Sequence, residues 1–255
     1  MTSARAVPAD AERESESQLA ARSVTHPLAR TLLVLTFSTG LVDAVSYLGI
    51  GHVFTANMTG NIVFLGFGLA GSGGLPVVAP LISLGAFMAG AGGGGVLAGR
   101  MAARRRRNLG LALAIEVALL VVAAVTAAAI DVRANAVSGD TVIALLAIAM
   151  GVRNATVRRV AVPDLTTTVL TMTLTGLAAD STLFGGSGKG TTRRSAAVLA
   201  MLAGALVGAL LLKSSLVVPL AVAAGLALIT SLLYGWREPG AGGDGLDPPR
   251  AGISA

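Results

Sequence analysis

The sequence has no cysteine, only two histidines and few charged residues. Without cysteine there can be no disulfide, no cysteine-ligated zinc and no thiol catalysis. His26 and His52 stand alone, and no histidine–acid cluster or Ser/His/Asp grouping indicates a metal site or a hydrolase. We therefore expect no metal, no cofactor and no enzymatic activity.

Charged residues make up 13% of the 255 residues, whereas a soluble domain carries roughly 25%. Hydrophobic residues make up 54%, and the mean hydropathy is +0.78. The low charge is concentrated between residues 31 and 236, so the chain is predicted to be an integral membrane protein. The net charge of +6 comes mostly from loop arginines, which are topology signals. The expected partner is the lipid bilayer and not a nucleic acid.

The two ends of the chain differ in composition from its centre. Residues 1–28 are polar and of mixed charge, which is typical of a disordered tail and not of a cleavable signal peptide. Residues 237–255 are rich in glycine and proline and predict a second disordered tail. Residues 29–236 are expected to form a single transmembrane domain.

Eight apolar segments lie in that domain, at about 31–50, 53–71, 76–99, 109–130, 141–158, 164–184, 194–212 and 216–236. The loop 100–107 carries five arginines and no acid, so it is expected in the cytoplasm with the N-terminal tail. Both can lie there only if 53–71 enters and leaves the membrane on one side, and the same argument applies to 164–184. We predict an all-α integral membrane protein with about six transmembrane helices and two re-entrant or broken segments. Both termini are expected in the cytoplasm, and eight full crossings are the alternative.

Three short matches recur in the same order at offsets of 111, 116 and 114 residues. They pair Gly40–Ala44 with Gly151–Ala155, Thr55–Gly60 with Thr171–Gly176, and Ala89–Ala91 with Ala203–Ala205. The halves are about 31–130 and 141–236. Because each half has an odd number of crossings, the two halves would have opposite orientations, which makes an inverted repeat.

Asp43 is an acidic residue within the first apolar run. On a helix, its face is polar or small, with Thr36, Thr39, Gly40, Ser46 and Tyr47. A carboxylate on such a stripe is a candidate proton or cation site. The alternative is a structural acid that is hydrogen-bonded to Thr or Asn, or paired with Arg153.

Other polar residues in the apolar runs extend this candidate site. The threonines and asparagines at 55–61 and 171–175 could form a selectivity site, or could only join helices by hydrogen bonds. Arg153 could meet Asp43 or an anionic substrate, and Glu116 is expected to snorkel toward loop 104–107. The predicted substrate or ion pathway comprises Asp43, Tyr47, Asn57, Thr59, Asn61, Arg153, Asn154 and Thr175. All of these except Tyr47 and Arg153 are expected to converge near the membrane midplane.

Small residues recur every four positions at Ala86, Gly90, Gly94 and Ala98, and again at Gly204 and Gly208. Such spacing is typical of close helix packing in membranes. We expect these faces to pack helices together and to carry no chemistry.

Two motifs resemble a known family. They are Gly40-x-Val42-Asp43-Ala44-x-Ser46-Tyr47 and Gly51-His-Val53-Phe54-x-Ala56-Asn57-Met58-Thr59-Gly60-Asn61. Together they resemble the YoaK family of bacterial inner-membrane proteins, over roughly residues 30–236. In the second motif of that family, a glutamine often precedes the asparagine, where this chain has Arg153 before Asn154. The resemblance implies a membrane location and a six-span topology, but no substrate.

The leading functional prediction is a small-solute permease or channel of the bacterial inner membrane, with proton coupling through Asp43. The solute itself stays open, as does assembly into a homo-oligomer. The alternative is a non-transporting membrane scaffold or accessory subunit. A polar path that reaches Asp43 would favour transport, whereas a packed centre with Asp43 fully paired would favour the scaffold.

Overall fold

The structure is a computed structural model that describes residues 27–101, 105–160, 170–182, 185–188 and 190–235. The predicted N-terminal tail lies almost wholly outside the described residues, and the C-terminal tail lies wholly outside them. Within these ranges all regular secondary structure is helical, which confirms the predicted all-α fold.

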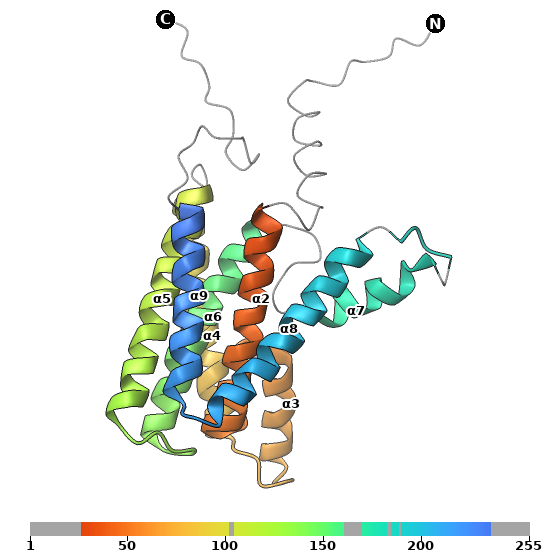
Figure 1. Cartoon of the computed structure of the whole chain (residues 1–255). Helices are drawn as coiled ribbons and strands as arrows, with labels where there is room; N and C mark the ends of the chain where they lie inside the picture. Colours follow the sequence, from red (N-terminus) through yellow and green to blue (C-terminus); the bar gives the residue numbers. More distant parts are fainter. Residues whose placement is uncertain (1–26, 102–104, 161–169, 183–184, 189, 236–255) are drawn as a thin grey trace, which may run out of the picture.

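The helices, in chain order, are α2 (Pro27–Val45), the π-helical η1 (Ser46–Gly51), α3 (Met58–Leu69), α4 (Val78–Arg100), α5 (Arg105–Ala129), α6 (Val137–Val160), α7 (Leu170–Ala179), α8 (Thr191–Leu212) and α9 (Val217–Gly235). Five helical stretches of the described chain are long and apolar enough to cross a membrane: α2 with η1, α4, α5, α6 and α8. The helix α9 has 19 residues, or about 28 Å at 1.5 Å per residue, and it runs beside α5 along the bundle (Figure 1). We count α9 as the sixth span.

The helix α3 and the described part of α7 are each shorter than a membrane span. They have 12 and 10 residues, about 18 and 15 Å, against about 30 Å of hydrocarbon. In Figure 1, α2 runs down to the lower end of the bundle and α4 rises from that same end, with α3 between them. The helix α7 lies beneath the upper part of α8, on the side that leans away from the other helices. The helix α3 fits the first predicted short segment, and the first part of the second, 164–184, lies outside the described residues.

The set of helix pairs in contact stays the same when the two halves of the chain are exchanged. The helix α2 packs on α8, α4 on α6, and α5 on α9. In addition, α5 contacts α6 and α9 contacts α2, while the short helices α3 and α7 rest on α4 and α8. If α2 to α5 are exchanged with α6 to α9, each of these pairs becomes another pair of the same set.

Glycines make the two tightest helix pairs possible. A Cβ added to Gly40 or Gly204 would collide with the backbone of the facing helix, at Met201 and Phe37 respectively. Gly90 and Gly151 stand in the same relation between α4 and α6. These contacts confirm the packing role that was predicted for the small-residue faces.

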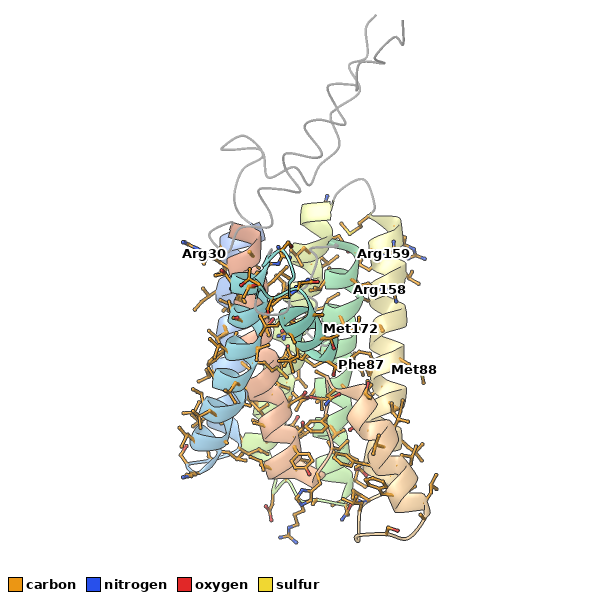
Figure 2. All side chains as sticks on the ribbon, turned by 90° about the vertical axis from the view of Figure 1, so that its right-hand side faces the viewer. Arg30, Phe87, Met88, Arg158, Arg159 and Met172 are labelled. Carbon is orange, nitrogen blue, oxygen red and sulfur yellow. The ribbon has the colours of Figure 1, made fainter. Side chains whose placement is uncertain are left out.

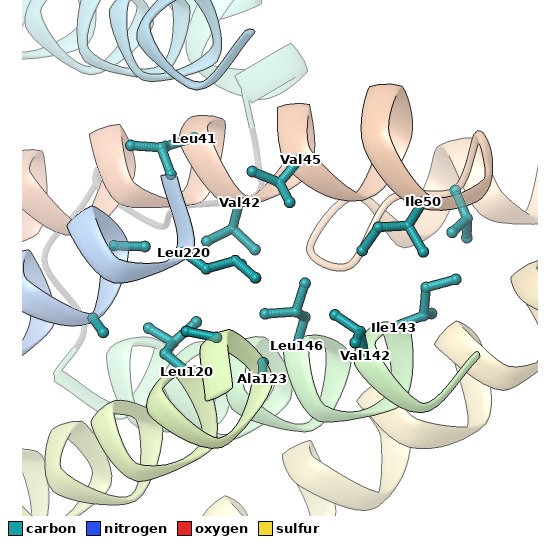
Figure 3. Close-up of a cluster of buried hydrophobic side chains, with 14 of the residues drawn as sticks. Leu41, Val42, Val45, Ile50, Leu120, Ala123, Val142, Ile143, Leu146 and Leu220 are labelled. Carbon is teal, nitrogen blue, oxygen red and sulfur yellow. The ribbon is translucent and has the colours of Figure 1, made fainter. Parts of the chain in front are cut away.

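A cluster of buried aliphatic side chains fills the centre of the bundle (Figure 3). Its members come mainly from α2, η1, α5, α6 and α9, with Val53 from segment 52–57 and Ala79 from α4. They include Leu41, Val42, Val45, Ile50, Leu120, Ile143, Leu146 and Leu220. Because Val42 and Val45 point into this cluster, the carboxylate of Asp43 is directed to another side of α2.

Basic residues gather at one end of the bundle. Figure 2 shows Arg30 on α2 and Arg158 and Arg159 on α6 toward the same end. The chain also turns there from α4 into α5, which begins at Arg105 (Figure 1).

Candidate functional site

Asp43 lies near the end of α2, and only 4% of the residue is exposed. Its Oδ1 accepts hydrogen bonds from the backbone N–H groups of Thr55 and Ala56, both at 2.9 Å, and from the Thr55 hydroxyl at 3.4 Å. Its Oδ2 is buried and has no hydrogen-bond partner in the described part of the chain. One carboxylate oxygen is therefore occupied and the other is free.

The backbone that Asp43 binds is a break between helices. The helix ends at His52, whose φ of 51° is left-handed and whose N–H donates to the carbonyl of Tyr47. Residues 52–57 are not helical, so their backbone groups lack the partners that a helix would provide. At membrane depth such groups must be satisfied by other parts of the protein, and Asp43 satisfies two of them.

Asn61 secures the same break from the other side. Its Oδ1 accepts from the Phe54 N–H at 2.9 Å, and its Nδ2 donates to the Phe54 carbonyl at 2.6 Å and to Ser83 Oγ at 3.1 Å. The Ser83 hydroxyl also donates to the Phe54 carbonyl, at 2.6 Å. Asn61 is fully buried, so this amide joins α3, segment 52–57 and α4.

Tyr47 belongs to an aromatic cluster beside the break. Its ring stacks on Phe54 with centroids 4.9 Å apart, and it meets His52 edge-on at 5.3 Å. Phe64 of α3 lies 5.8 Å from both Tyr47 and Phe54. Tyr47 thus packs against the outer side of segment 52–57.

The predicted convergence is only partial. Asn57 is exposed and caps α3 by accepting the Gly60 N–H at 3.4 Å. Thr59 is exposed, and Thr175 is exposed and donates to the Thr171 carbonyl of its own helix at 2.9 Å. Because residues two positions apart on a helix point about 200° apart, Thr59 cannot face inward when Asn61 does.

Arg153 does not pair with Asp43; it pairs with Glu116. Nε donates to Glu116 Oε2 at 2.8 Å and Nη2 donates to Oε1, and both side chains are fully buried. Nη1 donates to the Leu35 carbonyl and the Thr39 hydroxyl, each at 2.9 Å, and Nη2 donates to the Ser38 hydroxyl at 3.2 Å. These five bonds match the five N–H donors of a guanidinium. The prediction that Glu116 snorkels to the loop was wrong, because Arg153 of α6 binds the Glu116 carboxylate in the interior. The remaining N–H groups of Arg153 are bound by α2.

Asn154 follows Arg153 on α6 and is half-buried. Its Nδ2 donates to the Met150 carbonyl one turn earlier, at 2.9 Å. The first part of the predicted segment 164–184 lies outside the described residues, so the surroundings of Asn154 on that side are not described. Of the predicted pathway residues, Asp43 and Asn61 are the two that bind segment 52–57 from opposite sides.

Among the described residues, the group at the break that is left to bind a ligand is Oδ2 of Asp43. Within the described ranges, no group of three or more His, Cys, Asp or Glu side chains could hold a metal ion. A free carboxylate oxygen can take up a proton or accept a hydrogen bond from a cation. The Arg153–Glu116 pair was invisible to sequence reasoning, although two opposite charges in apolar runs are the signal that could have suggested it.

Comparison with known proteins gives a family. Residues 31–233 match the family model described as "Protein of unknown function (DUF1275)". The chain is also 34% identical over 154 residues to the UPF0700 transmembrane protein YoaK of Bacillus subtilis (strain 168). That alignment spans 58% of this chain and 65% of the relative's length. No solved structure matches. Since the family model covers most of the chain, the protein belongs to this family of transmembrane proteins, the YoaK family.

Proposed function

We propose that the protein is a small-solute permease or channel of the bacterial inner membrane, with Asp43 as the ionisable group on the path. One observation carries this proposal. The Asp43 carboxylate lies buried at a break in the helical backbone, bound to the break by one oxygen and unpartnered at the other.

A structural acid is most stable when both of its oxygens accept hydrogen bonds. A buried polar atom without a partner costs on the order of 1–3 kcal/mol, and an ionised group costs more. Arg153 has a partner for every N–H donor in the same bundle, so satisfied polar groups are achievable in this fold. A free Oδ2 is instead what a binding site needs before its ligand arrives.

The pattern of helix pairs supports an inverted repeat. Exchange of the halves maps the helix pairs onto one another, including α3 on α4 and α7 on α8. Each short helix also carries a buried polar residue, Asn61 in α3 and Thr173 in the described part of α7. Inverted repeats with broken helices that meet a central site are a recurring transporter design.

The basic end of the bundle is the cytoplasmic end in this proposal. Lys and Arg are enriched in cytoplasmic loops, and here they gather where α2 begins, α4 turns into α5, and α6 ends. Both termini then lie in the cytoplasm, because α2 begins and α9 ends at this end (Figure 1).

Proton coupling follows from the same carboxylate. A proton on Oδ2 neutralises Asp43, and a neutral group costs far less than a charge at membrane depth. Coupling would therefore operate by protonation and deprotonation of a residue that also binds the helix break at Thr55 and Ala56.

A non-transporting scaffold or accessory subunit is the competing function. The observation in its favour is the dense centre of the bundle, with the large aliphatic cluster and the fully paired Arg153. A scaffold requires no water at Asp43, whereas a permease or channel requires it at some point in its cycle.

Water access can be measured without knowledge of the solute, because the chain has no native cysteine. Ala56→Cys places a thiol at the break, where Ala56 is 2% exposed and contributes only its backbone N–H to Asp43. A small cationic methanethiosulfonate should modify it in sealed vesicles roughly tenfold or more faster than it modifies Leu146→Cys in the aliphatic cluster. Val137→Cys, at an 82% exposed position, controls for reagent activity. Equal inertness of the 56 and 146 thiols from both membrane faces would favour the scaffold.

A further inference from the structure

We infer that the solute is a small cation bearing N–H groups, which donates a hydrogen bond to Oδ2 of Asp43. The inference rests on the proposed permease or channel function and specifies its solute.

The charge balance of the described interior is negative at its centre. The buried charged side chains among the described residues are Asp43, Glu116, Arg153 and Arg193. Arg193 is the third residue of α8 and thus lies at the end of that helix. Arg153 and Glu116 neutralise each other through two hydrogen bonds. Of the described side chains, this leaves the carboxylate of Asp43 as the buried charge without an ion-pair partner away from a helix start.

An anion would be repelled from this position. Two charges interact far more strongly in the poorly screened interior of a protein than in water. A neutral solute can donate a hydrogen bond to Oδ2, but a cation gains the charge interaction in addition. The interior therefore favours a cation over an anion of similar size.

The donor set favours an N–H cation over a bare metal ion. Hard metal ions take about six or more oxygen ligands. Near Asp43, Oδ1 is already committed to Thr55 and Ala56, and the described residues hold no cluster of acids or histidines. An ammonium- or guanidinium-type group needs one acceptor for each N–H that it buries, so a single free oxygen is a usable anchor.

Proton and solute would compete for the same oxygen. A proton on Oδ2 removes the negative charge that attracts the cation, and a bound cation disfavours the proton. Loading of the solute therefore releases a proton, which makes the carboxylate an exchange site. Since Asp43 is buried, loading also requires the groups that cover Oδ2 to move.

Three planar probes of similar size test the inference: guanidinium, urea and nitrate carry a charge of plus one, zero and minus one. The purified full-length chain is reconstituted in liposomes, and the membrane potential is held at zero with valinomycin and equal potassium. Initial influx is measured for each probe and corrected for protein-free liposomes. We expect guanidinium to enter roughly tenfold or more faster than urea or nitrate. Asp43→Asn should abolish this preference.

A second pair of variants tests the charge balance at residues other than Asp43. Because Glu116→Gln is expected to lose stability, influx is measured per folded, reconstituted protein. Glu116→Gln leaves the Arg153 charge uncompensated in the interior, so guanidinium influx should fall and nitrate influx should rise. Adding Arg153→Gln to Glu116→Gln removes that charge and should restore the order of the three probes. If Glu116→Gln leaves the order unchanged, the charge-balance argument is wrong.

The outcomes separate the inference from the proposed function. Influx of urea or nitrate equal to that of guanidinium overturns the cationic solute but keeps the permease or channel. If no probe enters, thermal stabilisation of the detergent-solubilised protein by millimolar guanidinium chloride is compared with that by sodium chloride. Saturable stabilisation that is lost in Asp43→Asn supports the cation site and contradicts transport. Absence of both influx and stabilisation contradicts both proposals.

Discussion

The guanidinium of Arg153 on α6 and the carboxylate of Glu116 on α5 form a two-bonded ion pair whose side chains are fully buried. The same guanidinium holds α2 through the Leu35 carbonyl and the hydroxyls of Ser38 and Thr39. Thr39 lies one helical turn before Asp43 on the same face of α2. The pair thus connects three helices directly beside the candidate site.

Glu116→Gln should destabilise the protein strongly. The substitution leaves a buried guanidinium without its counter-charge, and breaking a buried pair in this way costs about 3–5 kcal/mol. A large loss of thermal stability in detergent is the expected readout. The matched control is Asp131→Asn, which breaks the Arg133–Asp131 pair with side chains 75% and 71% exposed. It should change stability by less than about 1 kcal/mol, since exposed pairs contribute little. Similar shifts for the two variants would contradict the importance of the buried pair.

Gly204→Ala and Gly92→Ala should change stability in opposite directions. A Cβ at Gly204 collides with the Phe37 backbone of α2, whereas a Cβ at Gly92 meets nothing within 4 Å. Overpacking costs roughly 1–3 kcal/mol, while alanine in an open helix position gains up to about 1 kcal/mol over glycine. Figure 2 shows Met88, one turn before Gly92, on the outer side of α4. Thermal unfolding of the two variants in one detergent measures the contrast. A stable Gly204→Ala protein would mean that α2 and α8 are not in close contact.

Asn61→Leu should release segment 52–57 from α3 and α4. Leucine fills the space but leaves the Phe54 N–H without its acceptor, at about 1–3 kcal/mol for a buried group, and leaves the Phe54 carbonyl with the Ser83 hydroxyl alone. The thiol of Ala56→Cys should then react faster in the Asn61→Leu background than in the parent. Thr59→Val is the control, because Thr59 is an exposed residue of the same helix and should leave the rate unchanged. Equal rates in the two backgrounds would show that Asn61 does not hold the break.

The re-entrant arrangement makes a direct topological prediction. Cysteines placed at His52, Ser72 and Ala134 should all react with a membrane-impermeant maleimide from outside intact cells, because these exposed positions lie at the end opposite the basic residues. A cysteine at Thr192 should react only after the membrane is permeabilised. If the thiols at 52 and 72 react from opposite faces, α3 crosses the membrane and the predicted topology is wrong.

Much of the architecture was predictable because it depends on local composition. Apolar runs gave the spans, the polar residues at 55–61 gave the break, and the spacing of Gly90, Gly94, Gly204 and Gly208 gave the tight packing faces. The offset of 116 residues between the Thr-Gly strings stays a prediction, because the residues just before Leu170 lie outside the described ranges.

The partners of polar side chains were much less predictable. Sequence periodicity placed Asp43 on a polar stripe, and the stripe does face a buried polar region with Thr36 and Thr39. It could not distinguish Arg153 bound to Asp43 from Arg153 bound to Glu116, because both pairings satisfy a buried charge. It also treated Thr59 and Asn61 alike, although only Asn61 points inward.

Composition and periodicity therefore determined that this chain is a bundle of membrane helices with two interruptions, because hydrocarbon accepts only long apolar helices with satisfied backbones. The residues that share a site were decided by the crossing of α2, α5 and α6. That crossing places Glu116 37 residues from Arg153 in the chain but within hydrogen-bonding distance. Hydrogen bonds and ion pairs act over about 3 Å, so they depend on helix rotation and register, which only the packed structure fixes.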